Sequence, residues 1–433
     1  MKKISFIILA AGKSRRMKSS KSKVLHEICE KPLISYVNDL AKKNSTSGTY
    51  YISSPQVQNY VLNNFKNAKT IIQKKQLGTA HAVECASKII NKNNNNVVVL
   101  FGDVPLIKNS TIKNLIKYKN KISTVGVIVT FLTDKPFGYG RVIIKNGFVS
   151  EVIEERDANE EQKNIKLCNS GILICDAKYL FRTIKKISNK NNKKERFLTD
   201  ICKIAYNEKK PFRFINCKEF EVSGINSPKQ LIDLDLKLQE SIKDKLIKKG
   251  VVLISPNTIR IGYNSKIEKG VVIEQNVVIK NGVKIKSGTK ILSGTYLEDC
   301  NIGENCIIGP HARIRPGTQI FNNVKVGNFV EIKNSKIGNF SSISHLSYIG
   351  DSSIGKNVNI GAGTITCNYD GIKKNKTYIA DNVFVGSNTS LIAPIKINKN
   401  AKIGAGSVIT RDIPKNSLAI ERSKLSIKKK IKK

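Results

Sequence analysis

The second half of the chain places an aliphatic residue at every sixth position, a period that few folds accept. Successive ladders run through Ile267, Ile273, Ile279, Ile285, Ile291 and Leu297, through Ile302, Ile308, Ile314, Ile320, Val326 and Ile332, and through Ile379, Val385, Leu391, Ile397, Ile403 and Ile409. An α-helix repeats every ~3.6 residues and an alternating strand every two, so neither explains this spacing. A triangular parallel β-helix does, because each face takes one hexapeptide whose aliphatic side chain points inward. The stretch between Tyr369 and Thr377 breaks the repeat and predicts a projecting loop.

The first half has a different pattern, in which apolar runs alternate with helical segments. Strands are expected at 4–9, 96–101 and 123–131 and a helix at 79–90, which together predict an α/β domain of Rossmann-like type with a mostly parallel sheet. From 227 to 250, Leu231, Leu234, Leu238 and Ile242 share one helical face, and Gly250 follows. The expected domains are therefore 1–226, a linker helix at 227–250, and a β-helix at 251–433 with a basic C-terminal tail.

Composition limits the classes of partner. The nine cysteines form no C-x-x-C pair and suit free thiols in a reducing compartment, so we expect a cytoplasmic protein. No apolar run approaches the roughly 18 residues that span a bilayer, so no membrane partner is expected. The formal charge of +42 is spread over both halves without a nucleic-acid-binding motif, and we interpret it as a solvated surface that attracts anionic substrates. A basic nucleic-acid-binding module is the alternative interpretation.

Two segments of the first half suggest nucleotide chemistry. Leu9-Ala10-Ala11-Gly12 follows an apolar strand and leads into basic residues, as in loops whose backbone N–H groups approach a triphosphate. Phe101-Gly102-Asp103 closes another buried strand, where a carboxylate can hold Mg²⁺ beside a nucleotide. Either motif alone is weak, since Gly, Lys and Asp are common in turns.

With the hexapeptide half, these motifs resemble the bacterial bifunctional enzymes that join an N-acetylglucosamine-1-phosphate uridyltransferase to a glucosamine-1-phosphate acetyltransferase, the GlmU family. The resemblance covers nearly the whole chain. It implies a left-handed β-helix that acetylates glucosamine 1-phosphate with acetyl-CoA. It also implies a first half that transfers uridylate from UTP to the product, releases pyrophosphate and needs Mg²⁺. The product would supply peptidoglycan and lipopolysaccharide precursors, and the assembly would be a homotrimer with acetylation sites at its seams.

For the first half, the resemblance assigns phosphate-facing catalytic roles to Arg16 and Lys23, and Mg²⁺ to Asp103 and Asn226. Uridine nucleotide and sugar binding would fall to Leu9, Ala10, Ala11, Gly12, Lys23, Gln73, Gly78, Thr79, Phe101, Gly102, Asp103, Gly140, Glu154, Asn169 and Asn226. The nucleophile is already an anion, so cations rather than a strong base are required. His26 and His81 are interpreted as structural.

For the second half, the resemblance places the general base at His345, and a His side chain suits this task because it titrates near neutral pH. The sugar phosphate would meet Arg315, Lys333, Tyr348, Asn359 and Lys374. Acetyl-CoA would contact Ala362, Asn368, Tyr369, Ser387, Ala405 and Arg422. His311 receives no role. Cys367 is interpreted as a packed thiol rather than an acyl carrier.

The sequence departs from the family pattern at two positions. Ser14 replaces a usual Gly, and Ser22 replaces a usual Pro before Lys23. Ser adopts most loop conformations but has less freedom than Gly at positive φ, and loss of Pro loosens a loop, so the expected consequence is at most a reduced uridyltransferase activity.

Four alternatives stay open. A glucose-1-phosphate adenylyltransferase would share the layout but would lack the His345 segment. A non-catalytic two-domain scaffold would lose Asp103, Lys23 or His345. The nucleic-acid-binding module is the third, and an enzyme in which only the acetyltransferase stays fully active is the fourth.

Overall fold

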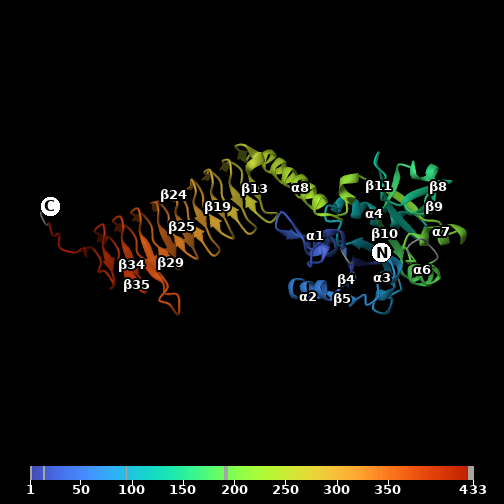
Figure 1. Cartoon of the computed structure of the whole chain (residues 1–433), viewed down its shortest axis with the longest axis horizontal. Coiled ribbons are helices and arrows are strands. Elements are labelled where there is room, and N and C mark those ends of the chain that lie inside the picture. Colours follow the sequence, from blue (N-terminus) through green and yellow to red (C-terminus); the bar gives the residue numbers. More distant parts are fainter. Residues whose placement is uncertain (1, 13–14, 94, 190–193, 428–433) are drawn as a thin grey trace, which may run out of the picture. The chain divides into compact units, whose positions relative to one another are not determined.

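The computed structural model describes residues 2–12, 15–93, 95–189 and 194–427. The chain divides into two compact units, Met1–Leu234 and Asp235–Lys433 (Figure 1). Helix α8 (Pro228–Lys248) lies within the segment 227–250 where a helix was expected and contains that division. Its Leu234 and Leu238 are buried, and Gly250 ends it with a left-handed φ of +92°. Ser14 and the last six residues of the basic tail lie outside the described residues.

The first unit is built on one mixed sheet in the order β11-β7-β10-β6-β1-β4-β5. Its strands are β1 (Lys3–Ala10), β4 (Gly48–Ser53), β5 (Lys69–Ile72), β6 (Asn95–Phe101), β7 (Gly126–Leu132), β10 (Leu167–Asp176) and β11 (Arg213–Cys217). The ribbon β8 (Arg141–Lys145) and β9 (Phe148–Ile153) extends it, and β2 (Glu27–Ile28) pairs with β3 (Lys31–Pro32) apart from it. The predicted strands are confirmed, and the sheet is mostly parallel. The exceptions are β10, which runs antiparallel to β6, β7 and β8, and the antiparallel pair of β8 and β9.

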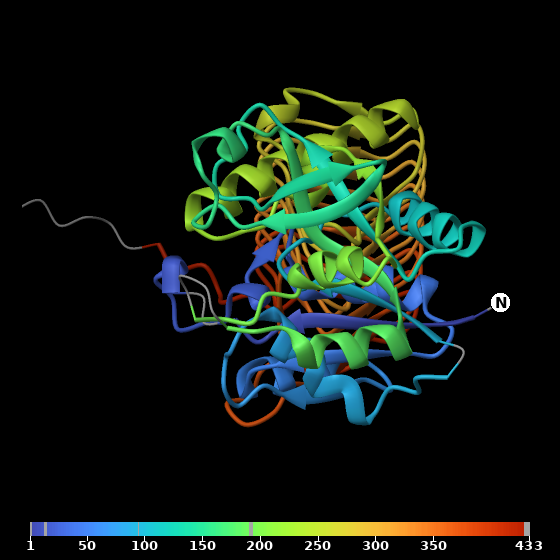
Figure 2. The ribbon, with the colours of Figure 1, turned by 90° about the vertical axis from the view of Figure 1, so that its right-hand side faces the viewer.

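Helices cover both faces of this sheet (Figure 2). They are α1 (Leu33–Asn44), α2 (Pro55–Asn64), α3 (Thr79–Cys85), α4 (Asn109–Lys121), α5 (Glu160–Lys163), α6 (Ala177–Thr183) and α7 (Asp200–Asn207). Side chains alternate along β1, so Phe6 and Ile8 pack with α1, α2 and α4, whereas Ile7 packs with α3, α6 and α7. The expected helix at 79–90 is shorter, because a 3₁₀ turn (Ala86–Lys88) replaces its last part.

The second unit is a left-handed parallel β-helix with three faces, each a parallel sheet. The first face holds β12 (Val252–Leu253), β15 (Val272–Ile273), β18 (Lys290–Ile291), β21 (Ile307–Ile308), β24 (Lys325–Asn328), β27 (Ser342–His345), β30 (Asn359–Ile360), β33 (Phe384–Val385), β36 (Lys402–Ile403) and β38 (Leu418–Ala419). The second holds β13 (Arg260–Ile261), β16 (Val278–Ile279), β19 (Tyr296–Leu297), β22 (Arg313–Ile314), β25 (Glu331–Lys333), β28 (Tyr348–Gly350), β31 (Ile365–Cys367), β34 (Ser390–Ile392) and β37 (Val408–Ile409). The third holds β14 (Lys266–Ile267), β17 (Lys284–Ile285), β20 (Asn301–Ile302), β23 (Gln319–Ile320), β26 (Lys336–Ile337), β29 (Ser352–Ile354), β32 (Thr377–Ile379) and β35 (Ile395–Ile397).

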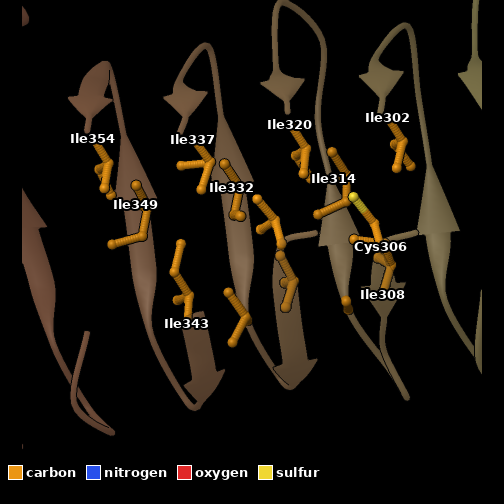
Figure 3. Close-up of a cluster of buried hydrophobic side chains, with 14 of the residues drawn as sticks. Ile302, Cys306, Ile308, Ile314, Ile320, Ile332, Ile337, Ile343, Ile349 and Ile354 are labelled. Carbon is orange, nitrogen blue, oxygen red and sulfur yellow. The ribbon is translucent and has the colours of Figure 1, made fainter. Parts of the chain in front are cut away.

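The aliphatic ladders form the core of this unit. Every residue of the three predicted ladders is buried. Figure 3 shows side chains of the second ladder, and of its continuation to Ile354, pointing into the coil from successive strands. Each of the two-residue strands that carry a ladder residue exposes its first residue more than its second, which is why the period-six pattern was visible in the sequence.

Departures from the regular coil concentrate at the corner between the second and third faces. There the ladder advances five positions instead of six at 297 to 302, 332 to 337 and 349 to 354. Asp299, Asn334 and Asp351 turn these shortened corners with positive φ, which Asp and Asn tolerate better than most residues. The predicted loop projects at the same corner in a later coil, with Ile372 at its tip 93% exposed. None of the described helices combines the length and apolar composition that crossing a bilayer requires.

Candidate active sites

A cavity of about 650 Å³ opens in the first unit where β1 and β6 end. Most residues predicted to bind the nucleotide line it, namely Leu9, Ala10, Ala11, Gly12, Lys23, Gln73, Gly78, Thr79, Phe101 and Asp103. Gly102 is buried between the predicted residues Phe101 and Asp103. A Cβ added to it would lie 3.1 Å from the Val24 side chain and 3.3 Å from the Leu9 carbonyl oxygen. The carboxyl ends of parallel strands are where open α/β sheets bind ligands.

Four of the predicted residues converge at this edge of the sheet. The Lys23 ammonium pairs with the Asp103 carboxylate and donates a 3.1 Å hydrogen bond to Oδ1 of Asn226. The same oxygen accepts a 2.9 Å hydrogen bond from Arg16. Two side-chain oxygens, from segments more than a hundred residues apart, thus meet at one cation beside the cavity.

The loop at Gly78 packs too closely for any other residue. Gly78 has φ of +106°, and a Cβ there would lie 2.4 Å from the Arg196 carbonyl oxygen. Gln73 is nearly buried, and its amide lies 3.1 Å from Nδ1 of His81. His81 therefore orients a cavity residue, in agreement with a structural role.

A second cavity, of about 290 Å³, adjoins the first and shares Thr79, Phe101 and Glu195 with it. The predicted sugar-binding residues Gly140, Glu154 and Asn169 line it. The backbone holds two of them together, since the Asn169 N–H donates to the Gly140 carbonyl at 2.8 Å. Next to Glu154, burial and then the Glu154 charge raise the pKa of Asp200 to about 6.

Sequence reasoning missed several residues of these cavities. Gln76 donates a 2.9 Å hydrogen bond to the Ala11 carbonyl from inside the first cavity. Its place in the Gln-Leu-Gly-Thr segment was the available signal. Glu195, Phe197, Leu198 and Thr199 come from a segment with no motif, and only the fold brings them to the cavities.

Ser22, expected to loosen the loop before Lys23, is anchored in two ways. Its φ of −57° is near the value that Pro imposes. Its N–H, which Pro would lack, donates a 2.7 Å hydrogen bond to Oε1 of Gln56. The other departure, Ser14, falls outside the described residues.

In the second unit, the register aligns His345 with predicted acetyl-CoA contacts. The backbone N–H groups of Gly363, Asn388 and Gly406 donate to the carbonyls of His345, Ala362 and Ser387 at 3.3, 2.7 and 2.7 Å. His345, Ala362, Ser387 and Ala405 therefore stack above one another at the same corner of successive coils. Oδ1 of Asn328, one coil before, lies 2.5 Å from Nδ1 of His345. Asn359 is exposed on the first face beside this corner, and the Arg422 side chain lies near Gly404.

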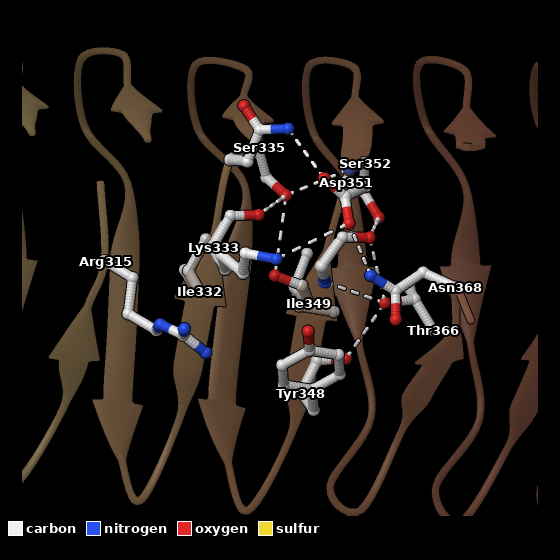
Figure 4. Close-up of polar contacts among 12 residues, drawn as sticks. Arg315, Ile332, Lys333, Ser335, Tyr348, Ile349, Asp351, Ser352, Thr366 and Asn368 are labelled. Carbon is white, nitrogen blue, oxygen red and sulfur yellow. Dashed lines mark hydrogen bonds and ion pairs between the residues drawn. The ribbon is translucent and has the colours of Figure 1, made fainter. Parts of the chain in front are cut away.

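The other edge of the second face carries a cluster of charged groups (Figure 4). Lys333 and Asp351 lie 4.0 Å apart, and Asn368 donates a 2.5 Å hydrogen bond to Asp351. Burial opposes ionisation of Asp351, but hydrogen bonds from Asn334 and Asn368 and the nearby lysine charges outweigh it and lower its pKa. Contact with Lys333 lowers the pKa of Lys374.

Two further predicted residues lie on strands of the same face. Arg315 pairs with Glu331 at 2.8 Å, which raises the pKa of Arg315. Arg315 follows β22 and Tyr348 begins β28, so both present side chains along the second face. Tyr369, 60% exposed, begins the projecting loop. In a single chain, the residues predicted to contact acetyl-CoA therefore lie at two opposite edges of the second face, with Asn368 and Tyr369 at one edge and the others near His345.

Among the described residues, no group of three or more His, Cys, Asp or Glu could hold a metal ion. None of the nine cysteines, all of which lie within the described residues, forms a disulfide, in agreement with their spacing. His311 stacks on Phe329 with ring centroids 5.6 Å apart.

Family models match both units. The first matches the MobA-like NTP transferase domain over residues 6–143. The second matches the bacterial transferase hexapeptide over 299–334 and 376–411, and the hexapeptide repeat of succinyl-transferase over 260–287. A solved structure described as a glucose-1-phosphate thymidylyltransferase from Bacillus anthracis is 19% identical and covers 54% of this chain and 94% of its own, with a TM-score of 0.45.

Curated relatives match nearly the whole chain. The bifunctional protein GlmU of Bartonella bacilliformis is 42% identical over 98% of this chain and 94% of its own length. Those of Caldicellulosiruptor saccharolyticus and Thermosipho africanus are each 40% identical, over 98% and 96% of this chain and 96% and 94% of their own lengths. With these relatives and the two units described above, the chain belongs to the family of the bifunctional protein GlmU.

Proposed function

We propose that the chain catalyses two consecutive reactions of UDP-N-acetylglucosamine synthesis. The β-helix transfers acetyl from acetyl-CoA to glucosamine 1-phosphate. The first unit then transfers uridylate from UTP to N-acetylglucosamine 1-phosphate and releases pyrophosphate. The observation that carries this proposal is the convergence of Asp103 and Asn226 on the Lys23 ammonium beside a nucleotide-sized cavity, in the same chain as His345 on a hexapeptide coil.

The residues present fit a bound Mg²⁺. Asp103 and Asn226 offer one carboxylate and one amide oxygen, the hard ligands that Mg²⁺ prefers. Both already contact the Lys23 ammonium. Mg²⁺ is typically held by one or two carboxylates together with substrate phosphates, so a larger acidic cluster is unnecessary. When bound, the ion would offset the negative charge of the phosphates.

In the first unit, the remaining groups position an anionic nucleophile against an anionic electrophile. Arg16 and Lys23 reduce the repulsion between the sugar phosphate and the α-phosphate of UTP. A phosphate oxygen of the sugar attacks the α-phosphorus, and the bond to pyrophosphate breaks. The segment 9–12 holds the nucleotide, Gln73, Gly78 and Thr79 recognise uracil, and Gly140, Glu154 and Asn169 hold the sugar.

In the second unit, His345 is the general base. Asn328 fixes its imidazole ring through Nδ1, which leaves Nε2 to take a proton from the substrate amine. The amine attacks the thioester carbonyl, a C–N bond forms, the C–S bond breaks, and coenzyme A leaves as its thiol. Arg315, Lys333, Tyr348, Asn359 and Lys374 hold the sugar phosphate; the proximity of two lysines is suited to an anion.

We further propose a homotrimer whose acetylation sites combine residues of two copies. Two observations support it. The contacts proposed for acetyl-CoA are divided between opposite edges of the second face. In addition, Phe329 and Leu346 are 58% and 63% exposed in left-handed corner conformations beside His345, and such apolar exposure favours burial against another chain.

We place the functional boundaries at 226 and 250, on either side of the α8 segment, and the protein in the cytoplasm, where free thiols persist.

Separate assays of the two half-reactions test the proposal. Asp103→Ala is expected to abolish uridylyl transfer and to spare acetyl transfer, and His345→Ala to do the reverse. Loss of pyrophosphate release in His345→Ala with acetylation intact would contradict the assignment of chemistry to the units. Use of ATP and glucose 1-phosphate in preference to the uridine substrates would identify the adenylyltransferase alternative, and inactivity of both halves the scaffold.

A further inference from the structure

A groove larger than the two cavities described above lies in the first unit, at the opposite edge of the sheet from the nucleotide cavity. Its volume is about 1040 Å³. Lys2 precedes β1, Asn96 is the second residue of β6, and Val125 precedes β7, so the groove lies at the amino ends of these strands. The eight residues of β1 separate it from the nucleotide cavity by roughly 25 Å of extended chain.

Positive charge dominates its lining. Six of the 16 lining residues are Lys or Arg, about twice the share in the whole chain, where 75 of 433 are basic. The groove is therefore richer in basic residues than the chain as a whole. One carboxylate, Asp176, opposes them, and Lys2 pairs with it at 2.5 Å. Arg182 pairs with Glu208 at 3.0 Å. The cations on α4, at the start of α6 and after α7 remain available to a ligand.

The groove also contains a buried amide that nothing in the protein satisfies. Asn96 is fully buried and lines the groove, and neither its Nδ2 nor its Oδ1 has a hydrogen-bond partner among the described residues. Leaving both atoms of a buried amide unpaired is costly, and in native proteins such groups are nearly always paired with protein, water or a ligand. Lys119 beside it is also nearly buried, and burial followed by the Lys2 charge lowers its pKa.

We propose that this groove binds a small molecule carrying two or more linked phosphates. Lys119, Lys178, Lys209 and Lys210 would neutralise the phosphates, and the Asn96 amide would donate to one phosphate oxygen. A compact polyphosphate fits better than a nucleic acid backbone because the groove has the volume of a ligand pocket. Such a ligand would not compete with UTP, since the two sites occupy opposite edges of the sheet.

Calorimetric titration of the full-length protein with inorganic tripolyphosphate tests this site. Because the nucleotide cavity can also bind the probe, the readout is the difference between two proteins. The variant Lys178→Gln/Lys209→Gln/Lys210→Gln is expected to bind one equivalent per chain fewer than the wild type, or to bind that equivalent at least tenfold more weakly. Unchanged stoichiometry and affinity would overturn the proposal.

The control removes the same charge elsewhere on this unit. Lys43, Lys66 and Lys88 are exposed and line neither the groove nor the nucleotide cavity, and their triple change to Gln is expected to leave binding intact. An equal loss in this control would show that only the overall positive charge attracts the probe and would overturn the site. Displacement of the probe from the groove by duplex DNA of arbitrary sequence would instead identify a nucleic-acid surface and overturn the small-ligand assignment.

Asn96→Leu separates a ligand-binding role from a structural one. An amide without partners contributes little to the fold, so the variant is expected to melt at the same or a higher temperature while binding tripolyphosphate several-fold more weakly. A lower melting temperature with unchanged binding would mean that the amide serves the fold and would remove its part in the proposal.

Discussion

Oδ1 of Asn226 accepts a hydrogen bond from Nζ of Lys23 at 3.1 Å, joining the last loop of the first unit to the loop that follows β1. The same ammonium contacts Asp103 at the end of β6. Three segments far apart in sequence are thereby held at one point. The proposed uridylyl reaction requires the charges of Lys23 and Asp103 and the amide oxygen of Asn226 to stay at this point.

Asp103→Asn is expected to lower kcat for uridylyl transfer by about 100-fold, because the amide keeps the shape of the carboxylate but loses the charge that we propose holds Mg²⁺ beside the phosphates. Acetyl transfer should be unchanged. The exposed carboxylate in Asp134→Asn is the matched control. Equal activity in the Asp103 variant and the control would contradict the metal assignment.

Asn328→Ala is expected to lower kcat for acetyl transfer by about tenfold with a small change in KM, because the imidazole of His345 loses the partner that fixes its orientation. Asn301→Ala, an exposed asparagine on another face, serves as control. A variant that changes KM alone would indicate that Asn328 contacts substrate instead of positioning the base.

Gly78→Ala should destabilise the first unit by about 1–3 kcal/mol, since it combines a positive φ with a Cβ against the Arg196 backbone. Uridylyl transfer should fall as well, because Gly78 lines the nucleotide cavity. Thermal unfolding measures the first effect. Gly138→Ala, which has open space at a positive φ of +87°, separates the contact from the backbone conformation.

Asp200→Asn is expected to stabilise the protein above pH 6. The folded-state pKa of Asp200 is about 6, above the ordinary value of 3.8, so the folded state binds the extra proton between these values. Stability is therefore lost as pH rises from about 4 to 6, and the penalty is complete above that range. The variant should gain about 1–2 kcal/mol at pH 7.5, less than the full pKa shift would give because Asp200 is partly exposed to solvent, and nothing near pH 3.5, as measured by denaturant unfolding. A gain that is the same at both pH values would refute the charge explanation.

Phe329→Glu/Leu346→Glu is expected to give monomers that lose acetyl transfer and keep uridylyl transfer, because charges replace the exposed apolar corner beside His345. Light scattering and the two assays measure this. Ile372→Glu, at the tip of the projecting loop, is an apolar-to-charged control outside that corner. A trimer that persists with both glutamates present would place the interface elsewhere.

Much of the β-helix could be predicted because its core has one inward residue per hexapeptide, and the period is therefore visible in the chain itself. The breaks in the ladder had no visible cause in the sequence. They arise because Asp299, Asn334 and Asp351 turn the corner with one residue fewer. Asp and Asn tolerate a left-handed φ, but their presence in a sequence does not require it. The closed coil imposes this conformation.

The site in the first unit was only partly predictable. Residues next to strand ends, such as Gly12 and Asp103, are indicated by local pattern because a strand fixes where its end lies. Glu195 and Thr199 are not, because the backbone of Arg196 brings them in by exchanging hydrogen bonds with Leu77 and Ala80. Long-range pairing of this kind leaves no periodic trace in the sequence.

The shortened corners have a consequence for engineering. The coil already accepts a missing residue at three places and an inserted loop at a fourth, all at the same corner, while the inward ladder remains buried throughout. Chain length at that corner is thus decoupled from the core. A foreign peptide could be inserted at this corner of any chosen coil, without disturbing the strands that pair with the neighbouring coils.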